Sequence, residues 1–288
     1  MNILEAAIQG VLLGGLYGLF AAGLSLIFGV MRIVNLGYGA FAVLSAYLAL
    51  ALTRSTSMSP LLALLIIVPV MAAFGFVLQR WVLQRTLDPS PLPSILVTFG
   101  LAVIVENALL LTQSADQERL TLGRIDTQAI QLGEIRIGVY PLAVFVLALV
   151  LLGVLSLVIQ KTGFGRSVRA ISDDPGTVEL MGIKPKRIYA WSGAIAFGLV
   201  AVAGVASGIQ SSFNPSSGSL LLIFAFEAVI IGGIGSLWGT LVGAMVLGVA
   251  QTVGAAFAPS QQLLIGHIVF LLFLLFLPRG LTGKATRA

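Results

Sequence analysis

The sequence lacks cysteine altogether and contains a single histidine, His267, among its 288 residues. Without cysteine the chain can form no disulfide, no thiolate nucleophile and no cysteine-ligated metal site. One histidine leaves little from which to build a histidine-rich metal cluster or a serine–histidine relay. The sequence also lacks a phosphate loop of the form GxxxxGKS or GxxxxGKT. We therefore expect the chain to bind no ATP through such a loop, and no cofactor of its own.

Charge is also scarce, since Asp, Glu, Lys and Arg make up only 9% of the residues and apolar types 58%. A water-soluble domain is about a quarter charged, and a mean hydropathy of +1.06 is far above that of a globular surface. The 16 basic and 11 acidic residues are too few to cover this chain in water. Lipid must face most of it, which excludes a soluble enzyme and weakens the nucleic-acid interpretation of a pI near 9.9.

Long charge-free runs supply the expected membrane spans. A hydrocarbon layer about 30 Å thick needs roughly 20 apolar residues in a helix. Five runs can each hold one span: Ala6–Met31, Ile33–Thr53, Ser55–Gln79, Pro89–Val105 and Ile137–Gln160. Because these runs are long and do not alternate with period two, we expect helices. The first run has no basic leader and is too long for a secretory signal, so we expect it to remain as a span.

Two longer runs must hold several helices each. Ile188–Phe226 has 39 residues and Ala228–Pro278 has 51, and breaks are expected at Asn214-Pro215, Gly235-Ser236 and Ala258-Pro259-Ser260. The expected fold is an all-α integral membrane protein, a polytopic bundle of about eight or nine transmembrane helices in a single domain over residues 1–288. The region 232–239 decides between the two counts.

Basic residues set the expected orientation, because cytoplasmic loops carry an excess of Lys and Arg. Nine spans with the N-terminus outside place 12 basic residues in inner loops and four in outer loops. The inner group is Arg32, Arg80, Arg85, Lys161, Arg166, Arg169, Lys184, Lys186, Arg187, Arg279, Lys284 and Arg287. The outer group is Arg54, Arg119, Arg124 and Arg136. We expect a multi-pass protein of the cytoplasmic (inner) membrane with a cytoplasmic C-terminus.

Two segments outside the spans are long enough to fold. The outer loop, about residues 113–138, has two arms, Gln128–Leu132 and Ile135–Val139, which are either a small hairpin or a plain connector. The inner loop, about residues 161–187, predicts two short helices. Asp174 and Pro175 are placed to begin the second of them, and Gly182 to end it in the left-handed conformation. Such a capped helix offers a rigid knob to a partner, and the alternative is an ordinary positive-inside loop.

Glycines recur every four residues at two places in the chain. Gly10, Gly14 and Gly18 form the early stripe, and Gly235, Gly239 and Gly243 the late one. Small residues at this spacing let helix backbones approach closely in lipid. We expect helix packing as their main role; sliding or hinging during gating is the alternative.

A few polar residues fall inside or beside the spans, where they are candidates for the pathway or for buried pairing. Glu106 and Asn107 lie near the outer end of the fourth span, and Glu227 begins the longest charge-free run. For Glu227 we favour structural pairing, and Glu106 is placed to reach the outer interface. Asn35 is expected to cap the second helix. His267, among apolar neighbours, is expected to hydrogen-bond at a helix interface.

Three segments resemble one known family. Gly165-Arg166-x-x-Arg169-Ala170-Ile171, followed by Leu180-Met181-Gly182-Ile183, resembles the coupling loop of branched-chain amino acid ABC transporter permeases. The stretch Leu24–Leu36, LSLIFGVMRIVNL, resembles the N-terminal signature of the LivH-type branch of that family. The stretch Val229–Ser236 resembles the family's late glycine-rich segment. The segments occur in order and span essentially the whole chain.

The resemblance implies a permease subunit of an importer for branched-chain or related amino acids. It implies a second permease (a related chain or the same one), two cytoplasmic ATPase subunits that use the ATP, and an extracytoplasmic binding protein. The ATPases would contact the coupling loop at Gly165, Arg166, Arg169, Ala170, Ile171, Leu180 and Gly182, with both arginines helping to fix that loop. The chain would then be a non-catalytic subunit.

Two other functions remain open on the residues alone. An ion-coupled secondary transporter usually has several intramembrane polar groups around the coupling ion. An intramembrane enzyme needs a catalytic pair or a metal cluster within the membrane. The sequence has only two acids and one histidine inside or beside its spans, and one loop with helix caps, which favours the importer. It leaves open whether the solute is a branched-chain amino acid, another amino acid, an amide, urea or an aromatic acid.

Overall fold

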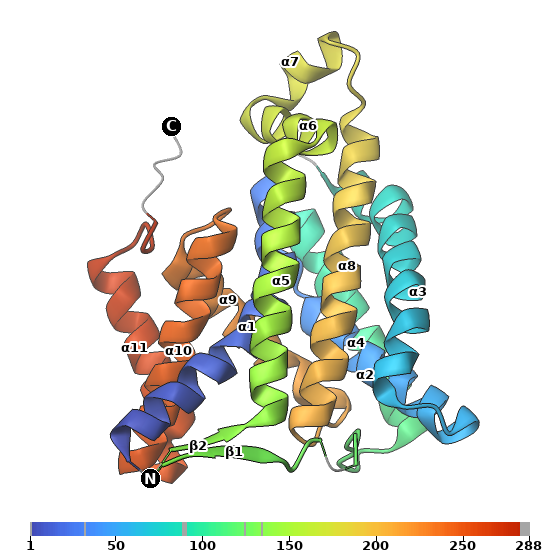
Figure 1. The fold of residues 1–288 in the computed structure, drawn as a ribbon. Coiled ribbons are helices and arrows are strands. Elements are labelled where there is room, and N and C mark those ends of the chain that lie inside the picture. Colours follow the sequence, from blue (N-terminus) through green and yellow to red (C-terminus); the bar gives the residue numbers. More distant parts are fainter. Residues whose placement is uncertain (1, 32, 88–90, 124, 134, 283–288) are drawn as a thin grey trace. The chain divides into compact units, whose positions relative to one another are not determined.

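The computed structural model describes residues 2–31, 33–87, 91–123, 125–133 and 135–282. Within these ranges nine helices are long and apolar enough to cross a membrane. They are formed by α1 (Ile3–Met31), α2 (Tyr38–Thr56), α3 (Pro60–Trp81), α4 (Leu92–Gln113), α5 (Val139–Lys161), α8 (Pro185–Gln210), α9 (Gly218–Gly232), α10 (Leu237–Phe257) and α11 (Gln262–Phe276), as labelled in Figure 1. The spans of α3, α9 and α11 also include an adjoining 3₁₀ turn, and run over Pro60–Thr86, Pro215–Gly232 and Pro259–Phe276. The expected all-α polytopic membrane fold is confirmed.

Short elements join these helices. Three 3₁₀ turns, η1 (Leu83–Thr86), η2 (Pro215–Ser217) and η3 (Pro259–Gln261), accompany the helices. Two of them fall at the expected proline breaks, and the third expected break separates α9 from α10. Of the residues named above, Arg32, Pro89, Arg124, Lys284 and Arg287 lie outside the described residues.

The chain divides into two compact units. Unit 1 comprises Met1–Ser25, Thr121–Leu152 and Ile223–Ala288, and unit 2 comprises Leu26–Leu120 and Gly153–Leu222. Each unit is therefore built from segments far apart in the sequence.

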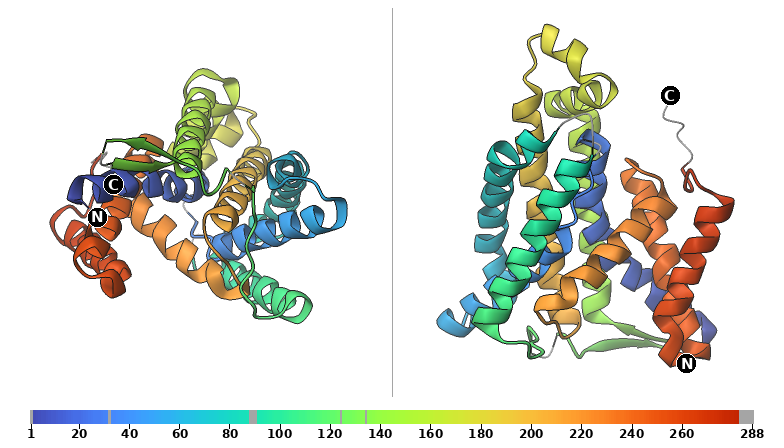
Figure 2. Two further views of the ribbon diagram at one scale, coloured as in Figure 1. Left: turned by 60° about the horizontal axis from the view of Figure 1, so that its bottom comes forward. Right: turned by 180° about the vertical axis from the view of Figure 1, so that it is seen from behind.

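In unit 2 the helices α2, α3 and α8 pack together around aromatic rings. The Phe41 and Phe197 rings lie 4.9 Å apart, and the buried Tyr38 hydroxyl donates to the Ala196 carbonyl at 3.0 Å. A Cβ added at Gly75 would lie 2.5 Å from the Phe197 side chain. Because Gly75 has no side chain, α3 can approach α8 closely. The two helices lie side by side in Figures 1 and 2.

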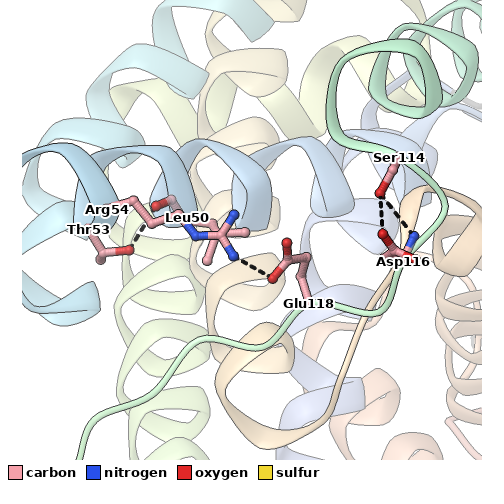
Figure 3. Close-up of polar contacts among 6 residues, drawn as sticks. All are labelled: Leu50, Thr53, Arg54, Ser114, Asp116 and Glu118. Atoms are coloured by element: carbon pink, nitrogen blue, oxygen red, sulfur yellow. Dashed lines mark hydrogen bonds and ion pairs between the residues drawn. The ribbon is translucent and has the colours of Figure 1, made fainter.

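An extended segment after α4 is tied into unit 2 at the opposite end from the α6 region (Figure 1). Glu118 and Phe213 exchange two backbone hydrogen bonds, each 2.8 Å long. Arg54, at the end of α2, donates to the Glu118 carboxylate at 2.6 Å, and Ser114 donates to Asp116 (Figure 3). The Leu120 amide adds a bond to the Gly208 carbonyl at 2.9 Å. We call residues 114–120 the strap.

Unit 1 contains a hairpin and five helices or helix segments, from α1, α5, α9, α10 and α11. The strands β1 (Ala129–Leu132) and β2 (Ile135–Gly138) pair antiparallel, with Ile130 opposite Ile137. This confirms the hairpin rather than the plain connector. The Gln9 side chain at the start of α1 donates to the Arg136 carbonyl at 2.6 Å, which joins the hairpin to that helix. α10 and α11 are connected by η3 and pack against each other (Figure 2).

Candidate functional site: the α6–α7 loop and a buried polar cluster

The segment between α5 and α8 folds as two capped helices, α6 (Gly163–Asp173) and α7 (Pro175–Leu180), as the sequence predicts. We call residues 162–184 the α6–α7 loop. The Thr162 hydroxyl accepts from the Gly165 amide at 3.1 Å and so caps α6. The Asp174 carboxylate accepts from the amides of Gly176 at 3.0 Å and Thr177 at 3.2 Å, which caps α7. The Thr177 hydroxyl and these amides stabilise the carboxylate and lower the pKa of Asp174 below its ordinary value.

Two contacts hold α6 against the end of α5. A Cβ added at Gly165 would lie 2.0 Å from the Ile159 carbonyl oxygen, so the residue must be glycine for the backbones to meet. The Arg169 guanidinium donates to the same carbonyl. A further bond, from the Ser172 hydroxyl to the Gly29 carbonyl at 2.7 Å, fastens α6 to the end of α1. The turn that follows α5 is therefore rigid.

The two short helices bury one apolar face and expose an apolar tip. Val168, Ile171 and Val178 are buried. Leu180 and Met181, at the end of α7, are 90% and 74% exposed. The chain then reverses at Gly182, whose φ of +79° favours glycine. Exposed apolar side chains on a rigid, capped element are typical of a contact surface for another protein.

The other residues expected in a coupling role occupy different environments. Ala170 is half-buried in α6. The Arg166 side chain is exposed and hydrogen-bonds to none of the residues that the structure describes, so the expectation that it helps to fix the loop is wrong. The fixing contact comes from Arg169 alone, because the position three residues later reaches the Ile159 carbonyl. Arg166 is left available to a partner.

Unit 1 contains a second candidate, which we call the polar cluster: Tyr17, Phe224, Glu227, Gln251 and His267. Glu227 on α9 and His267 on α11 form a hydrogen bond of 2.5 Å between Oε1 and Nδ1. Their side chains are 5% and 34% exposed. This confirms the expectation that His267 hydrogen-bonds between helices, and the partner is an acid 40 residues away.

Aromatic rings and an amide complete the polar cluster. The Tyr17 hydroxyl on α1 donates to Gln251 Oε1 on α10 at 2.7 Å. The Tyr17 ring lies 4.8 Å from the Phe224 ring, and Phe224 in turn stacks on His267 at 6.2 Å. Glu227 Oε2 and Gln251 Nε2 are buried and have no hydrogen-bond partner among the described residues. Within the described residues, the polar cluster therefore has one buried acceptor and one buried donor whose hydrogen bonds are not formed.

Sequence reasoning missed Tyr17 and Gln251. Gln251 was detectable as a long polar side chain in the charge-free run that also holds His267. Tyr17 lies within the early glycine stripe, whose spacing predicted helix packing and not a polar contact. No spacing rule relates the two, since they are 234 residues apart.

The remaining polar candidates do not converge. Asn35 is fully buried, but its side chain accepts from the Gly37 amide at 3.0 Å, and α2 begins at Tyr38 without a side-chain cap bond. The expected capping role is therefore wrong, because Asn35 closes a turn just before the helix. Glu106 is half-buried on α4, and Asn107 is exposed and donates to the Val103 carbonyl of its own helix at 2.8 Å. Among the described residues no three His, Cys, Asp or Glu side chains gather as a metal site would need.

The glycine stripes separate into helix contacts and a turn. A Cβ added at Gly10 or Gly14 would lie 2.4 Å from the Val249 Cα or 2.5 Å from the Met245 Cα of α10, and Gly18 faces Leu241 of the same helix. Gly239 and Gly243 lie against α9, where an added Cβ would lie 2.3 Å from the carbonyl oxygens of Gly232 and Ala228. Gly235 departs from the expected stripe: it has φ +80° in the turn before α10 begins at Leu237.

Comparison with known families gives one full-length match. The sequence matches the family described as the permease component of the branched-chain amino acid transport system over residues 6–277. The α6–α7 loop and the polar cluster both lie inside this range.

Individual relatives agree with the family match. The chain is 29% identical to the high-affinity branched-chain amino acid transport system permease protein BraD of Pseudomonas aeruginosa, over 98% of this chain and 96% of the relative. It is 24% identical to LivH of Salmonella typhimurium, a permease protein of the same description, over 99% and 96%. Among solved structures it resembles PsaBC from Streptococcus pneumoniae, with a TM-score of 0.51 at 11% identity, covering 97% of this chain and 93% of that one. That likeness concerns the fold.

Proposed function

Because the chain belongs to the permease-component family of branched-chain amino acid transport systems, we propose that it imports branched-chain amino acids as the membrane-spanning subunit of an ATP-binding-cassette transporter. The observation that carries this proposal is the family match over residues 6–277, together with nine span-length helices in the described chain. The family match supports this function over an ion-coupled secondary transporter.

The α6–α7 loop is the surface that we assign to the ATPase subunits. It would lie in the cytoplasm with the C-terminus, which follows from the excess of basic residues in the loops on that side. The transporter would contain a second permease chain, two ATPase subunits and an extracytoplasmic binding protein. Closure of the ATPases must reach the membrane helices as rigid-body motion, and a doubly capped helix pair bonded to α5 and α1 can transmit it.

In this assembly the chain is non-catalytic. ATP binds and is hydrolysed on the partner subunits, and this chain contributes no cofactor site. The binding protein carries most of the solute selectivity, so the permease needs no tight site of its own.

The test is reconstitution of the chain with its partner subunits in proteoliposomes, followed by uptake of radiolabelled leucine. We expect uptake that requires ATP and the binding protein, with a sugar of similar mass as the negative solute. Uptake driven by an ion gradient without the ATPases would overturn the proposal.

One substitution tests the coupling surface. Arg166→Glu replaces an exposed, unpartnered cation by an anion, so we expect at least a tenfold loss of leucine uptake and of solute-stimulated ATP hydrolysis. The variant should elute and melt as the parent does, since the Arg166 side chain hydrogen-bonds to none of the described residues and the backbone bond from its amide to the Thr162 carbonyl is kept. Arg85→Glu, an exposed arginine on η1 outside the loop, is the matched control. Unchanged uptake by Arg166→Glu would count against the assigned surface.

A further inference from the structure

A cavity of about 670 Å³ opens in unit 2 where the end of α3 meets the start of α8. Its lining includes four basic residues: Arg80 of α3, and Lys184, Lys186 and Arg187 around the start of α8. Glu179 of α7 is the acid that also lines it. The cavity therefore carries a surplus of positive charge that a single carboxylate does not balance.

The four basic groups are not neutralised by the described part of the chain. The ion pairs found there are Arg54–Glu118 and Glu227–His267, and neither involves the cavity. Within the described ranges, the Arg80 side chain donates only to the neutral Gln84 side chain, at 3.5 Å. Lys184, Lys186 and Arg187 are exposed. The cavity therefore presents exposed cations to which an anionic ligand could bind.

The position of three of these cations adds to the imbalance. Lys184 is the N-cap of α8 and forms no side-chain cap bond, and Lys186 and Arg187 lie in the first turn. The N-terminal end of a helix carries the positive end of its dipole, so basic side chains there are unfavourable unless an anion lies beside them. The chain places three where acidic residues would ordinarily be favoured.

The surroundings of the cavity are apolar on the side of α3. Phe76, which lines the cavity, packs edge-on against Trp191 of α8 with ring centroids 5.2 Å apart. Trp191 and Trp81 are 49% and 65% exposed, and tryptophan is enriched where a bilayer meets water. Exposed apolar residues continue along one face of α3 at helical spacing: Val77, Phe74, Val70 and Ile66. The cationic cavity thus borders an apolar stripe about 17 Å long, roughly the depth of one bilayer leaflet.

We propose that this cavity binds the phosphate headgroup of an anionic phospholipid, with the acyl chains along the exposed face of α3. Basic pockets between spanning helices bind phosphate headgroups in this way. Each part of one lipid would have a matching surface. The four cations match the charged headgroup, the two exposed tryptophans match the interface, and the apolar stripe matches the acyl chains. The exposed Leu180 and Met181 tip that we assign to the ATPases does not line the cavity. The cavity does share Glu179, Gly182, Ile183 and Lys184 with the α6–α7 loop.

Native mass spectrometry of the purified full-length chain in detergent tests this proposal. We expect phosphatidylglycerol adducts that survive detergent removal, while phosphatidylcholine is lost. The double variant Lys186→Gln with Arg187→Gln should weaken phosphatidylglycerol binding about 30-fold, because each basic residue near an anionic headgroup contributes about fivefold.

Two further variants keep the result interpretable. Arg85→Gln with Lys161→Gln removes the same charge from exposed positions that do not line the cavity, and should bind as the parent does. Lys186→Arg with Arg187→Lys keeps the charge and should retain binding. If the neutralised variant fails to elute as a monodisperse peak, the charge-retaining variant and a neutralising Arg80→Gln variant decide the question.

Three results would overturn the proposal. They are equal retention of phosphatidylcholine, unchanged phosphatidylglycerol binding by the neutralised variant, and saturation of the cavity by inorganic phosphate at the same concentration as the lipid. The last result would assign the site to a free anion, because the acyl chains would then contribute nothing. None of these outcomes depends on whether the chain transports leucine.

Discussion

The α6–α7 loop and the polar cluster of unit 1 place polar and apolar groups in opposite ways. In the loop, side chains such as Thr162 and Asp174 bond to backbone amides, and the apolar Leu180 and Met181 face outward. In the polar cluster the helices satisfy their own backbones, and the side chains of Glu227 and His267 pair with each other inside the unit. Polar side chains therefore serve local folding in one region and contacts between distant helices in the other.

This difference indicates how well each region should tolerate amino-acid substitutions. The two helices of the loop are capped by bonds between residues two or three positions apart, so their shape is set locally and the tip is free to contact another protein. The polar cluster depends on the close approach of α1, α9, α10 and α11, which in turn depends on glycines such as Gly14 and Gly243. Changes to helix contacts should therefore destabilise the chain more than changes to the loop.

The largest effect is expected for Gly14→Leu. An added Cβ would lie 2.5 Å from the Met245 Cα, a backbone atom that no rotamer change can move away. We expect the free energy of unfolding in mixed SDS micelles to fall by about 3 kcal/mol, at the upper end for overpacking. Gly100→Leu on α4 is the control, because nothing lies within 4 Å of its added Cβ. If both variants lost the same free energy of unfolding, close helix contact at Gly14 would not explain the loss.

The next effect concerns the pair in the polar cluster. Glu227→Leu and His267→Leu should each lower the free energy of unfolding, and a double-mutant cycle should give a coupling of about 1 kcal/mol, as for hydrogen bonds between membrane helices. Glu227→Gln keeps an acceptor for His267 and should cost less than Glu227→Leu. Additive losses within error would show that the 2.5 Å contact contributes no coupling.

A smaller, local effect is expected for Asp174→Ala. Removal of the cap should raise amide hydrogen exchange in α7 on the order of fivefold, while α3 and α8 stay protected. The pKa of Asp174 is lowered in the folded chain, so the cap is fully present above the ordinary pKa of Asp and is lost as the pH falls through the lowered value. The parent and Asp174→Ala should therefore converge in acid. A difference that persists after Asp174 is protonated would contradict the capping role.

The smallest effect on stability, with the largest on function, is expected at the tip. Leu180→Ser with Met181→Ser alters exposed side chains, so the free energy of unfolding should change by less than about 0.5 kcal/mol. ATP-driven leucine uptake in the reconstituted transporter should nevertheless fall at least tenfold, because the apolar contact to the ATPase is lost. Leu111→Ser, at an equally exposed position on α4, should leave uptake intact. Full uptake by the tip variant would show that Leu180 and Met181 do not form the contact with the ATPase.

Local features could be predicted from the sequence because their determinants are adjacent in the chain. Asp174, Pro175 and Gly182 mark the limits of α7 within eight positions, and the structure places the cap and the left-handed turn there. The hairpin arms likewise follow from alternation on either side of a glycine. Asn35 shows the limit of such rules, since its side chain closes a turn two residues before the helix that it was expected to cap.

Contacts between distant helices could not be predicted. The pairing of Tyr17 with Gln251 depends on which faces of α1 and α10 meet, and a span with apolar residues all round does not encode its orientation. Gly235 fits a spacing of four with Gly239, yet the helix begins only after Ser236, so the spacing was accidental. The cationic cavity draws residues from two segments about 100 positions apart, which charge counts along the chain did not combine.

The strap has a mechanical consequence for the chain. It is the last part of unit 2 before the sequence enters unit 1 at Thr121. Glu118 is held by two backbone hydrogen bonds to Phe213 and Leu120 by one to Gly208, while the Glu118 side chain is held by Arg54. Tension applied from residue 121 onward is therefore carried by α2 and α8 before it reaches α4. A force applied to the hairpin would therefore be borne by the hydrogen bonds of the strap and would not reach α4.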